Sequence, residues 1–110
     1  MICMSNKYNA KKQFYKGKKF DSKKELARYL VLEQMEKNNY ISELEIQPVF
    51  PLIVNGIKIG RYTADFRYKN NNNEVIVEDV KSKITRTRDY LLRKKILATY
   101  RPPIHIKEII

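Results

Sequence analysis

Residues 61–81 have the sequence RYTADFRYKNNNNEVIVEDVK, in which two strand-like runs flank a turn of four asparagines. The first run contains Asp65, and the second ends in Asp79-Val80-Lys81. Because side chains alternate along a strand, Asp79 and Lys81 should share one face while Glu78 points to the other. Pairing of the two runs through the turn therefore predicts that Asp65 lies beside Asp79, with the lysine on the same side.

This cluster predicts a site for a divalent cation. A hard cation such as Mg²⁺ or Mn²⁺ takes oxygen ligands and keeps waters and phosphate oxygens in its shell. Asp65, Asp79 and the backbone carbonyl of Val80 would be a sufficient set of protein ligands. Lys81 could then orient the attacking water or stabilise negative charge on a phosphate. The alternative is an exposed cross-strand ion pair between Lys81 and a carboxylate, which contributes only about 0–1 kcal/mol.

A helix is expected upstream of these strands. The sequence Ser22-Lys23-Lys24-Glu25 fits a capping box, in which the serine hydroxyl and the glutamate carboxylate satisfy backbone amides at the helix start. The apolar residues that follow are spread around more than one face, which indicates a well-buried helix. It should stop around Asn38-Asn39.

Three extended stretches, a second helix and a last strand complete the pattern. Asn55-Gly56 predicts a type I′ hairpin turn, and Pro48 and Pro51 predict an edge strand, a kink or a break. A strand that follows a helical crossover is expected to pair parallel. The expected ranges are Ile41–Val54, Ile57–Lys69 and Glu74–Ser82, then a helix from Thr85 or Thr87 to around Tyr100, and a strand over Ile104–Ile109. The order helix-strand-strand-strand-helix-strand predicts an α/β fold with a mixed central sheet flanked by helices.

The chain has 110 residues, which is the size of one domain. We expect a basic N-terminal arm over residues 1–20 and a folded domain over residues 21–110. Lysine and arginine number 23 against 12 acidic residues, a formal net charge of +11. An excess this large favours a polyanionic partner, nucleic acid first and a membrane surface second, and no apolar run is long enough to span a membrane.

Basic side chains are the expected contacts to DNA. Lysine and arginine hold phosphates without reading sequence, and the tyrosines and phenylalanines between the arm lysines can stack on unpaired bases. Gln47 is a further candidate, for which a solvated strand residue is the simpler interpretation. The candidates are Lys11, Lys12, Lys16, Lys18 and Lys19 in the arm, Lys83, Arg86 and Arg88 after the third strand, and Gln47.

The cysteine content indicates which cellular compartment to expect. Cys3 is the only cysteine, which excludes an intrachain disulfide, and no Cys/His group has the spacing of a zinc site. The first residues lack the apolar core of a signal peptide. We therefore expect a reducing cytoplasm.

The ordered elements, with one acid followed by acid-any-lysine, resemble the PD-(D/E)XK nuclease superfamily. The matching residues are Asp65 and Asp79-Val80-Lys81, whereas Ala64 stands in place of the proline of the family name. Many members carry a further glutamate on the first helix, and Glu25 is the match in this sequence. The resemblance implies a restriction-endonuclease-like core, a Mg²⁺ or Mn²⁺ cofactor and Glu25 as a third metal-binding carboxylate. The capping box gives Glu25 a competing structural role.

More narrowly, most of residues 14–100 are similar to a group of short phage proteins. The shared features appear here as FDSKKE at residues 20–25, QPVF at 47–50, YTADF at 62–66 and VEDVK at 77–81. This resemblance implies action on branched DNA, such as junctions or flaps, in phage recombination or replication. A Holliday-junction-resolvase-like activity in the cytoplasm of the host cell would fit it.

The resulting hypothesis is a metal-dependent DNA endonuclease in which Asp65, Asp79, Lys81 and Glu25 form the catalytic site. Cutting both strands of a junction needs two sites and one chain carries one, so we expect a homodimer. Two alternatives stay open. A non-catalytic nucleic-acid-binding protein would use the same basic residues and keep the acids as ion-pair partners, and an interaction protein would bind an acidic protein partner.

Overall fold

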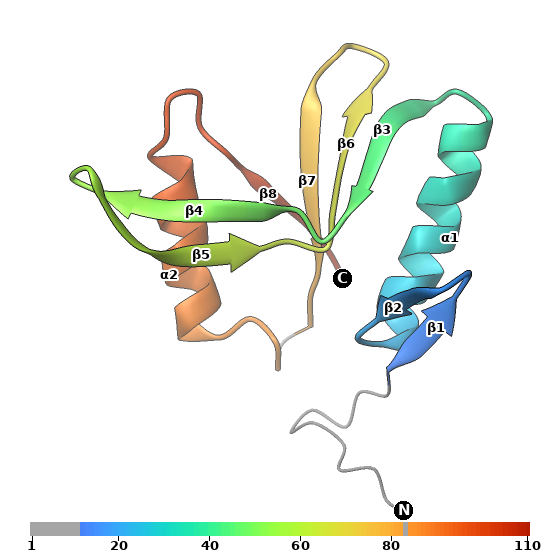
Figure 1. Ribbon diagram of the computed structural model, residues 1–110, viewed down its shortest axis with the longest axis horizontal. Helices are drawn as coiled ribbons and strands as arrows, with labels where there is room; N and C mark the ends of the chain where they lie inside the picture. The colour runs from blue at the N-terminus through green and yellow to red at the C-terminus, as the bar shows by residue number, and fades with distance from the viewer. Residues whose placement is uncertain (1–11, 83) are drawn as a thin grey trace, which may run out of the picture.

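The computed structural model describes residues 12–82 and 84–110, so Lys11 and Lys83 lie outside the described residues. Within them the chain forms eight strands and two helices (Figure 1). Their bounds are β1 Gln13–Tyr15, β2 Lys18–Phe20, α1 Lys23–Lys37, β3 Ile41–Ile46, β4 Val49–Val54, β5 Ile57–Thr63, β6 Phe66–Asn70, β7 Val75–Val80, α2 Arg88–Ala98 and β8 Ile106–Ile109.

Helix α1 begins where the capping box predicted. The Glu25 N–H donates to the Ser22 hydroxyl at 3.1 Å, and the Asp21 N–H donates to the Glu25 carboxylate at 3.1 Å. Both bonds satisfy amides that have no partner inside the helix. The expected helix start is therefore confirmed.

The central sheet is mixed and has the strand order β3-β6-β7-β8. β6 pairs antiparallel with both β3 and β7, while β8 pairs parallel with β7 after the crossover through α2. The parallel pairing of the last strand was expected from its helical connection and is confirmed. β4 and β5 form a separate two-stranded ribbon that extends away from α1 (Figure 1).

Both long extended stretches around the Asn55-Gly56 turn are interrupted, at positions that lie opposite each other. Gln47 has a positive φ of 55° and Pro48 has no N–H to continue the ladder, which ends β3 and confirms the expected break. The partner stretch breaks opposite, at Ala64 and Asp65, so the single strand expected over Ile57–Lys69 is wrong. Hydrogen bonds from Gln47 N to Asp65 O at 2.8 Å and from Ala64 N to Pro48 O at 3.0 Å carry the pairing through the bend.

The bend gives the protein two hydrophobic cores on opposite faces of the sheet. Alternation along β6 and β7 sends residues such as Tyr68 to one face and Val77 to the other. The core beside α1 contains Phe20, Tyr29, Leu32, Ile41, Phe66 and Tyr68. The core between α2 and the β4–β5 ribbon contains Phe50, Leu52, Tyr62, Ala64, Val77, Tyr90, Leu97 and Ile106. The expected α/β fold with a mixed sheet and two helices is confirmed at this level.

Part of the segment expected as a basic arm is folded. Residues 13–20 form the hairpin β1–β2, which turns through Lys16 and Gly17 and contacts α1. Phe20, the last residue of this hairpin, is buried against Tyr29 of α1, and the centroids of the two rings are 5.1 Å apart. The high lysine content of the segment hides this anchor in the sequence.

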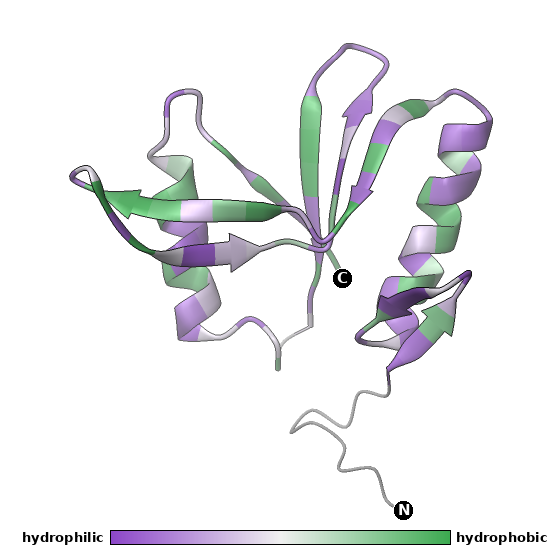
Figure 2. Ribbon diagram, viewed as in Figure 1, coloured by the Kyte–Doolittle hydropathy of each residue, from purple (hydrophilic) through white to green (hydrophobic). Residues whose placement is uncertain are grey.

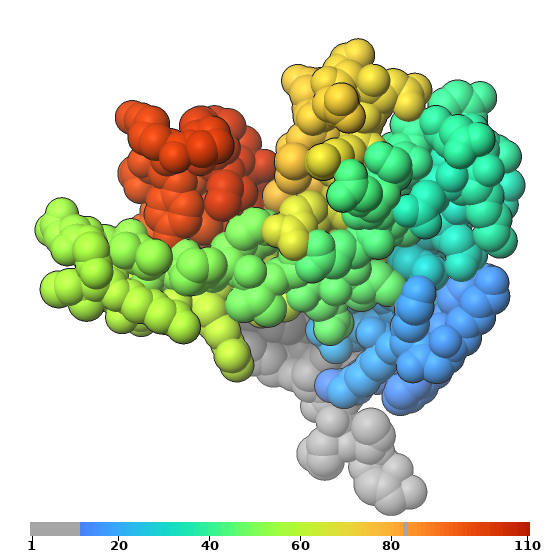
Figure 3. All heavy atoms as spheres, turned by 45° about the horizontal axis from the view of Figure 1, so that its top comes forward, coloured from blue at the N-terminus to red at the C-terminus, as the bar shows by residue number. Residues whose placement is uncertain are grey.

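The hydrophobic residues are concentrated on the strands that contribute to the two cores. Figure 2 shows hydrophobic residues along most of β4 and β7, with β7 becoming hydrophilic toward the end that leads to α2. Figure 3 shows the β4–β5 segment extending alongside the C-terminal segment. No helix within residues 12–82 and 84–110 is long and apolar enough to cross a membrane.

The turn at Asn55-Gly56 yields a stability test. Both residues have positive φ, 52° and 79°, as the expected type I′ turn requires. A Cβ at Gly56 would meet nothing within 4 Å, so the cost of Gly56→Ala is conformational rather than steric. We expect Gly56→Ala to lower the free energy of unfolding by about 1 kcal/mol, measured by urea denaturation.

Gly60→Ala is the matched control in the same ribbon. Gly60 lacks a positive φ, and its added Cβ would lie at an ordinary contact distance, 3.9 Å, from the Leu52 side chain. Its stability should equal or slightly exceed that of the unmodified protein. Equal losses in both variants would contradict the turn assignment.

Candidate metal centre

The bend places the first predicted acid against the second. Because β6 begins directly after the break, the Asp65 N–H faces β7 and donates to the Asp79 carboxylate at 2.9 Å. In return, the Val80 N–H donates to the Asp65 carboxylate at 2.7 Å. Asp65 and Asp79 are therefore neighbours on the paired strands, and each carboxylate is held by a backbone amide of the other strand.

Burial makes this acid pair costly to ionise. Loss of solvation raises the pKa of Asp65 from 3.8 to about 6, although the amide of Val80 and the ammonium of Lys81 oppose the shift. Burial likewise raises the pKa of Asp79 to about 6 against the opposing effect of Lys81. Two buried carboxylates that ionise near neutral pH reduce stability, and a bound cation would offset that cost.

Glu25 brings a third carboxylate from the first turn of α1. Burial and then the negative charge of Asp65 raise the pKa of Glu25 to about 7, and Asp79 adds to the effect. One oxygen of Glu25 accepts the Asp21 N–H, so the expected capping role is present together with proximity to the two aspartates. Asp21, which sequence reasoning did not single out, contributes further negative charge to Glu25 and Asp65.

One oxygen of Asp79 has no partner. Asp79 is only 2% exposed, and its buried Oδ2 atom has no hydrogen bond to any of the residues that the structure describes. Buried carboxylate oxygens are nearly always paired, so this atom calls for a ligand. Mg²⁺ is commonly held by one or two carboxylates with the rest of its shell from water and phosphate, and the Asp65–Asp79 pair fits that pattern. Within the described parts of the chain, however, no three acidic, histidine or cysteine groups are close enough together to enclose a metal ion.

Lys81 lies where the acid-any-lysine spacing predicts. Its charge acts on both Asp65 and Asp79, yet across residues 12–82 and 84–110 it forms no ion pair with a carboxylate. Its ammonium instead lies over the ring of Tyr90, 4.1 Å from the centroid. The ion-pair alternative considered for Lys81 is therefore not what the structure contains.

Glu78 faces the opposite side of the sheet, as strand alternation predicts. It is completely buried and binds the Arg28 guanidinium through two hydrogen bonds of 2.8 and 2.7 Å, and Tyr68 donates a third bond to it. A buried carboxylate with this many partners is a structural group. Adjacent acids on β7 thus have separate roles.

A cluster of hydrogen bonds around Glu108, the hub of this part of the structure, was not predicted from the sequence. Glu108 on β8 lies opposite Asp79 in the parallel register and accepts hydrogen bonds from Arg86, Tyr90 and Lys94 at 2.9, 2.8 and 3.1 Å. Although burial opposes it, these bonds lower the pKa of Glu108 to about 2. The only sequence signal was an acid within an alternating strand, which is common on surfaces.

Two other predicted site residues lie at the bend or on the strand end. Val80 contributes its N–H to Asp65, and its side chain packs against the α1-side core. Gln47 is exposed and occupies the bend itself, where its N–H donates to Asp65 O. Gln47 therefore helps to shape the site through its backbone.

The predicted DNA-contacting residues divide by whether the fold already pairs them. Lys16 pairs with Glu33 at 3.6 Å, Lys18 donates to the Tyr29 hydroxyl at 3.0 Å, and Arg86 pairs with Glu108. Lys12 lies 4.0 Å from Asp21, and Lys19 is close enough to Lys12 for that neighbouring charge to lower its pKa. Arg88 is exposed at the start of α2.

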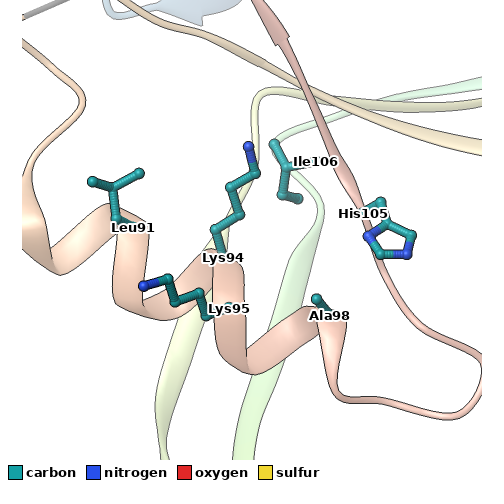
Figure 4. A pocket seen from close by; sticks show the side chains of 6 residues that line it. All are labelled: Leu91, Lys94, Lys95, Ala98, His105 and Ile106. Atoms are coloured by element: carbon teal, nitrogen blue, oxygen red, sulfur yellow. The ribbon is translucent and has the colours of Figure 1, made fainter.

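Hollows lie on more than one side of α2. A cleft of about 490 Å³ lies beside Lys81 and is lined among others by Arg61, Tyr62 and Tyr90. A second hollow, of about 450 Å³, lies between α2 and the segment leading into β8 (Figure 4). Its lining includes Lys94, His105 and Ile106 but no acidic residue, whereas the first cleft contains Lys81 of the predicted site and the acid Asp89.

A family model described as "Protein of unknown function (DUF1064)" matches residues 5–109. The chain therefore belongs to this family. Comparisons with curated proteins and with solved structures found no match.

The two adjacent acids of β7 should respond oppositely to neutralisation. Glu78→Gln leaves Arg28 without its buried counter-ion, and we expect a loss of about 3 kcal/mol in the free energy of unfolding. Asp79→Asn removes a group whose ionisation burial disfavours, so its stability at about pH 7.5 should equal or exceed that of the unmodified protein. Urea denaturation without divalent cations measures both, and a larger loss in Asp79→Asn would contradict the assignment.

Stability should also depend on pH in a way that a divalent cation reverses. Asp65, Asp79 and Glu25 have folded-state pKa values raised to about 6, 6 and 7, so between about pH 4 and 7 the folded protein binds more protons than the unfolded chain. These groups therefore reduce stability as pH rises through that window. Millimolar Mn²⁺ should raise the melting temperature at about pH 7.5 and have little effect at about pH 5, where protons compete for the same oxygens. A cation effect independent of pH would argue against these acids as ligands.

Proposed function

We propose that this member of the DUF1064 family is a metal-dependent endonuclease that hydrolyses DNA phosphodiester bonds. The observation that carries the proposal is the buried, unpartnered Oδ2 of Asp79. Backbone amides hold the Asp65 and Asp79 carboxylates on neighbouring strands, and the nearby Lys81 ammonium pairs with no acid among the described residues. Acid pairs of this kind with a free oxygen are suited to a hard divalent cation.

The order of the elements supports a restriction-endonuclease-like core as the finer description of the fold. Helix α1, the bent pair of long strands, β7, α2 and β8 follow the order that the sequence resemblance implies. Asp65, the acid of the first position, directly precedes β6, and the triplet Asp79-Val80-Lys81 begins in the last two residues of β7 and ends just after it. The helix glutamate comes from the first turn of α1.

The chain's own residues would divide the chemistry among them. Asp65 and Asp79 would hold Mg²⁺ or Mn²⁺, and Glu25 would complete the acidic side of the site. When bound, the cation would supply Lewis acidity and make a water more acidic. Lys81 would place its positive charge where negative charge develops on the phosphate being cleaved.

The charge distribution supports DNA as the substrate. The net charge of +11 favours a polyanion, and the cleft beside Lys81 also presents Arg61 and Arg93. Lys12, Lys19 and Arg88 remain on the surface as further phosphate contacts. Branched DNA is the proposed class of substrate, with a homodimer supplying one site for each strand.

A non-catalytic DNA-binding protein is the second candidate. The observation in its favour is that, in the described ranges, no three potential ligands enclose a metal ion. In that case the acids would serve the fold only, and cation addition would change neither stability nor DNA processing.

A cleavage assay tests the proposal directly. Labelled four-way junctions, flaps and linear duplexes are incubated with Mg²⁺, with Mn²⁺ or with EDTA, and the products are resolved on denaturing gels. We expect cation-dependent nicking, reduced about 100-fold or more in Asp79→Asn and in Lys81→Met. Glu43→Gln, which changes an exposed acid of β3 paired with Lys69, is the matched control and should cleave like the unmodified protein.

Equal background signal from the unmodified protein and Asp79→Asn would overturn the nuclease proposal. Salt-dependent DNA binding in the same samples would then identify the binding protein, because phosphate contacts weaken steeply with salt. Weak binding that is insensitive to salt would instead favour a protein partner.

A further inference from the structure

Lys81 lies near two carboxylates and contacts neither. It acts electrostatically on both Asp65 and Asp79, and Asp79 Oδ2 is buried with no hydrogen bond. An ammonium beside an unpartnered carboxylate oxygen would ordinarily close onto it, because a charge-assisted hydrogen bond satisfies both groups. Something in the structure therefore holds the ammonium elsewhere.

The ring of Tyr90 is what holds it. The Lys81 ammonium lies 4.1 Å from the centroid of this ring, within the range of a cation–π contact. Tyr90 is 5% exposed, and its ring packs against that of Tyr62 with centroids 6.3 Å apart. The ring is therefore a largely buried, fixed surface on which the ammonium lies.

Both ends of Tyr90 are anchored. Its N–H donates to the Thr87 hydroxyl at 3.2 Å in the cap of α2, and its own hydroxyl donates to Glu108 at 2.8 Å. Glu108 is fixed in turn by Arg86 and by Lys94, which extends from α2 toward β8 in Figure 4. The cap of α2, the packing on Tyr62 and the bond to Glu108 thus hold the ring in place independently of Lys81.

We propose that Tyr90 is a positioning residue that holds the Lys81 ammonium away from Asp79 and so leaves the buried Oδ2 oxygen unpaired, as a ligand for a divalent cation. This inference rests on the proposed cation site and adds a reason why a lysine so near that site does not occupy it. Without the ring, Lys81 would pair with Asp79, and an entering cation would have to displace it.

Mn²⁺ binding measured by isothermal titration calorimetry, without DNA, tests the inference. Tyr90→Phe keeps the ring and loses only the hydroxyl, so its affinity should stay within about twofold of the unmodified protein. Tyr90→Leu removes the ring, and we expect about tenfold weaker binding or more, because the ammonium then competes for Asp79. The double variant Tyr90→Leu/Lys81→Met should recover the lost affinity, which a general disturbance of the core would not allow.

Lys81→Met alone covers the case in which Tyr90→Leu does not fold. With the ring present, the ammonium is not bonded to the Asp79 carboxylate. Lys81→Met should therefore leave Mn²⁺ affinity within about threefold of the unmodified protein, because it removes only a nearby, unpaired positive charge. A tenfold or greater gain would overturn the inference. Unchanged binding in a folded Tyr90→Leu variant would overturn it as well.

A nuclear magnetic resonance measurement separates failure of this inference from failure of the proposed function. Ring current from Tyr90 should shift the Lys81 Cε protons upfield in the unmodified protein and in Tyr90→Phe, with no cation present. Absence of the shift overturns the positioning role. If the shift is present but Mn²⁺ binding does not depend on Asp79, the cation site of the proposed function fails while the placement of the ammonium stands.

Discussion

The structure depends on the reciprocal hydrogen bonds between Asp65 and the end of β7. The Asp65 amide binds the Asp79 carboxylate, and the Val80 amide binds the Asp65 carboxylate. This arrangement is reached only because the ribbon bends at Gln47 and Pro48, which turns the start of β6 toward β7. The same bend separates the β4–β5 ribbon from the sheet and creates the space that α2 fills. A single local distortion thus forms the second core and the acid pair together.

Strand alternation places the two adjacent acids of β7 on opposite faces of the sheet, where one stabilises the fold and the other belongs to the candidate site. Glu78 on the α1 side has its charge neutralised by Arg28, whereas Asp79 on the α2 side keeps an unpartnered oxygen. Burying two neighbouring acids on one strand is costly unless each is compensated. Arg28 compensates the charge of Glu78 within the protein, and the proposed cation would compensate that of Asp79. The α2 side also carries the Tyr90–Glu108 pair, which positions the lysine from this face.

Features that depend on local chemistry could be predicted from the sequence. The Ser22 cap and the Asn55-Gly56 turn need only a few neighbouring residues, and the opposite facing of Glu78 and Asp79 follows from a period of two. The break at Ala64 could not be predicted, because Pro48 on the partner strand imposes it. The role of Tyr90 was hidden for a similar reason, since it requires Glu108 from 18 residues away. The burial of Phe20 was masked by the lysines around it.

The central claim is that the Asp65–Asp79 pair is a site for a divalent cation, and anomalous diffraction from crystals soaked in Mn²⁺ at about pH 7.5 tests it most directly, because both acids are then ionised. The account predicts an anomalous peak at about 2.0–2.3 Å from Asp79 Oδ2 and from an Asp65 oxygen, the coordination distance of small divalent cations, with the Lys81 ammonium still over Tyr90. A map with no peak there, and with the ammonium bonded to Asp79, would contradict it.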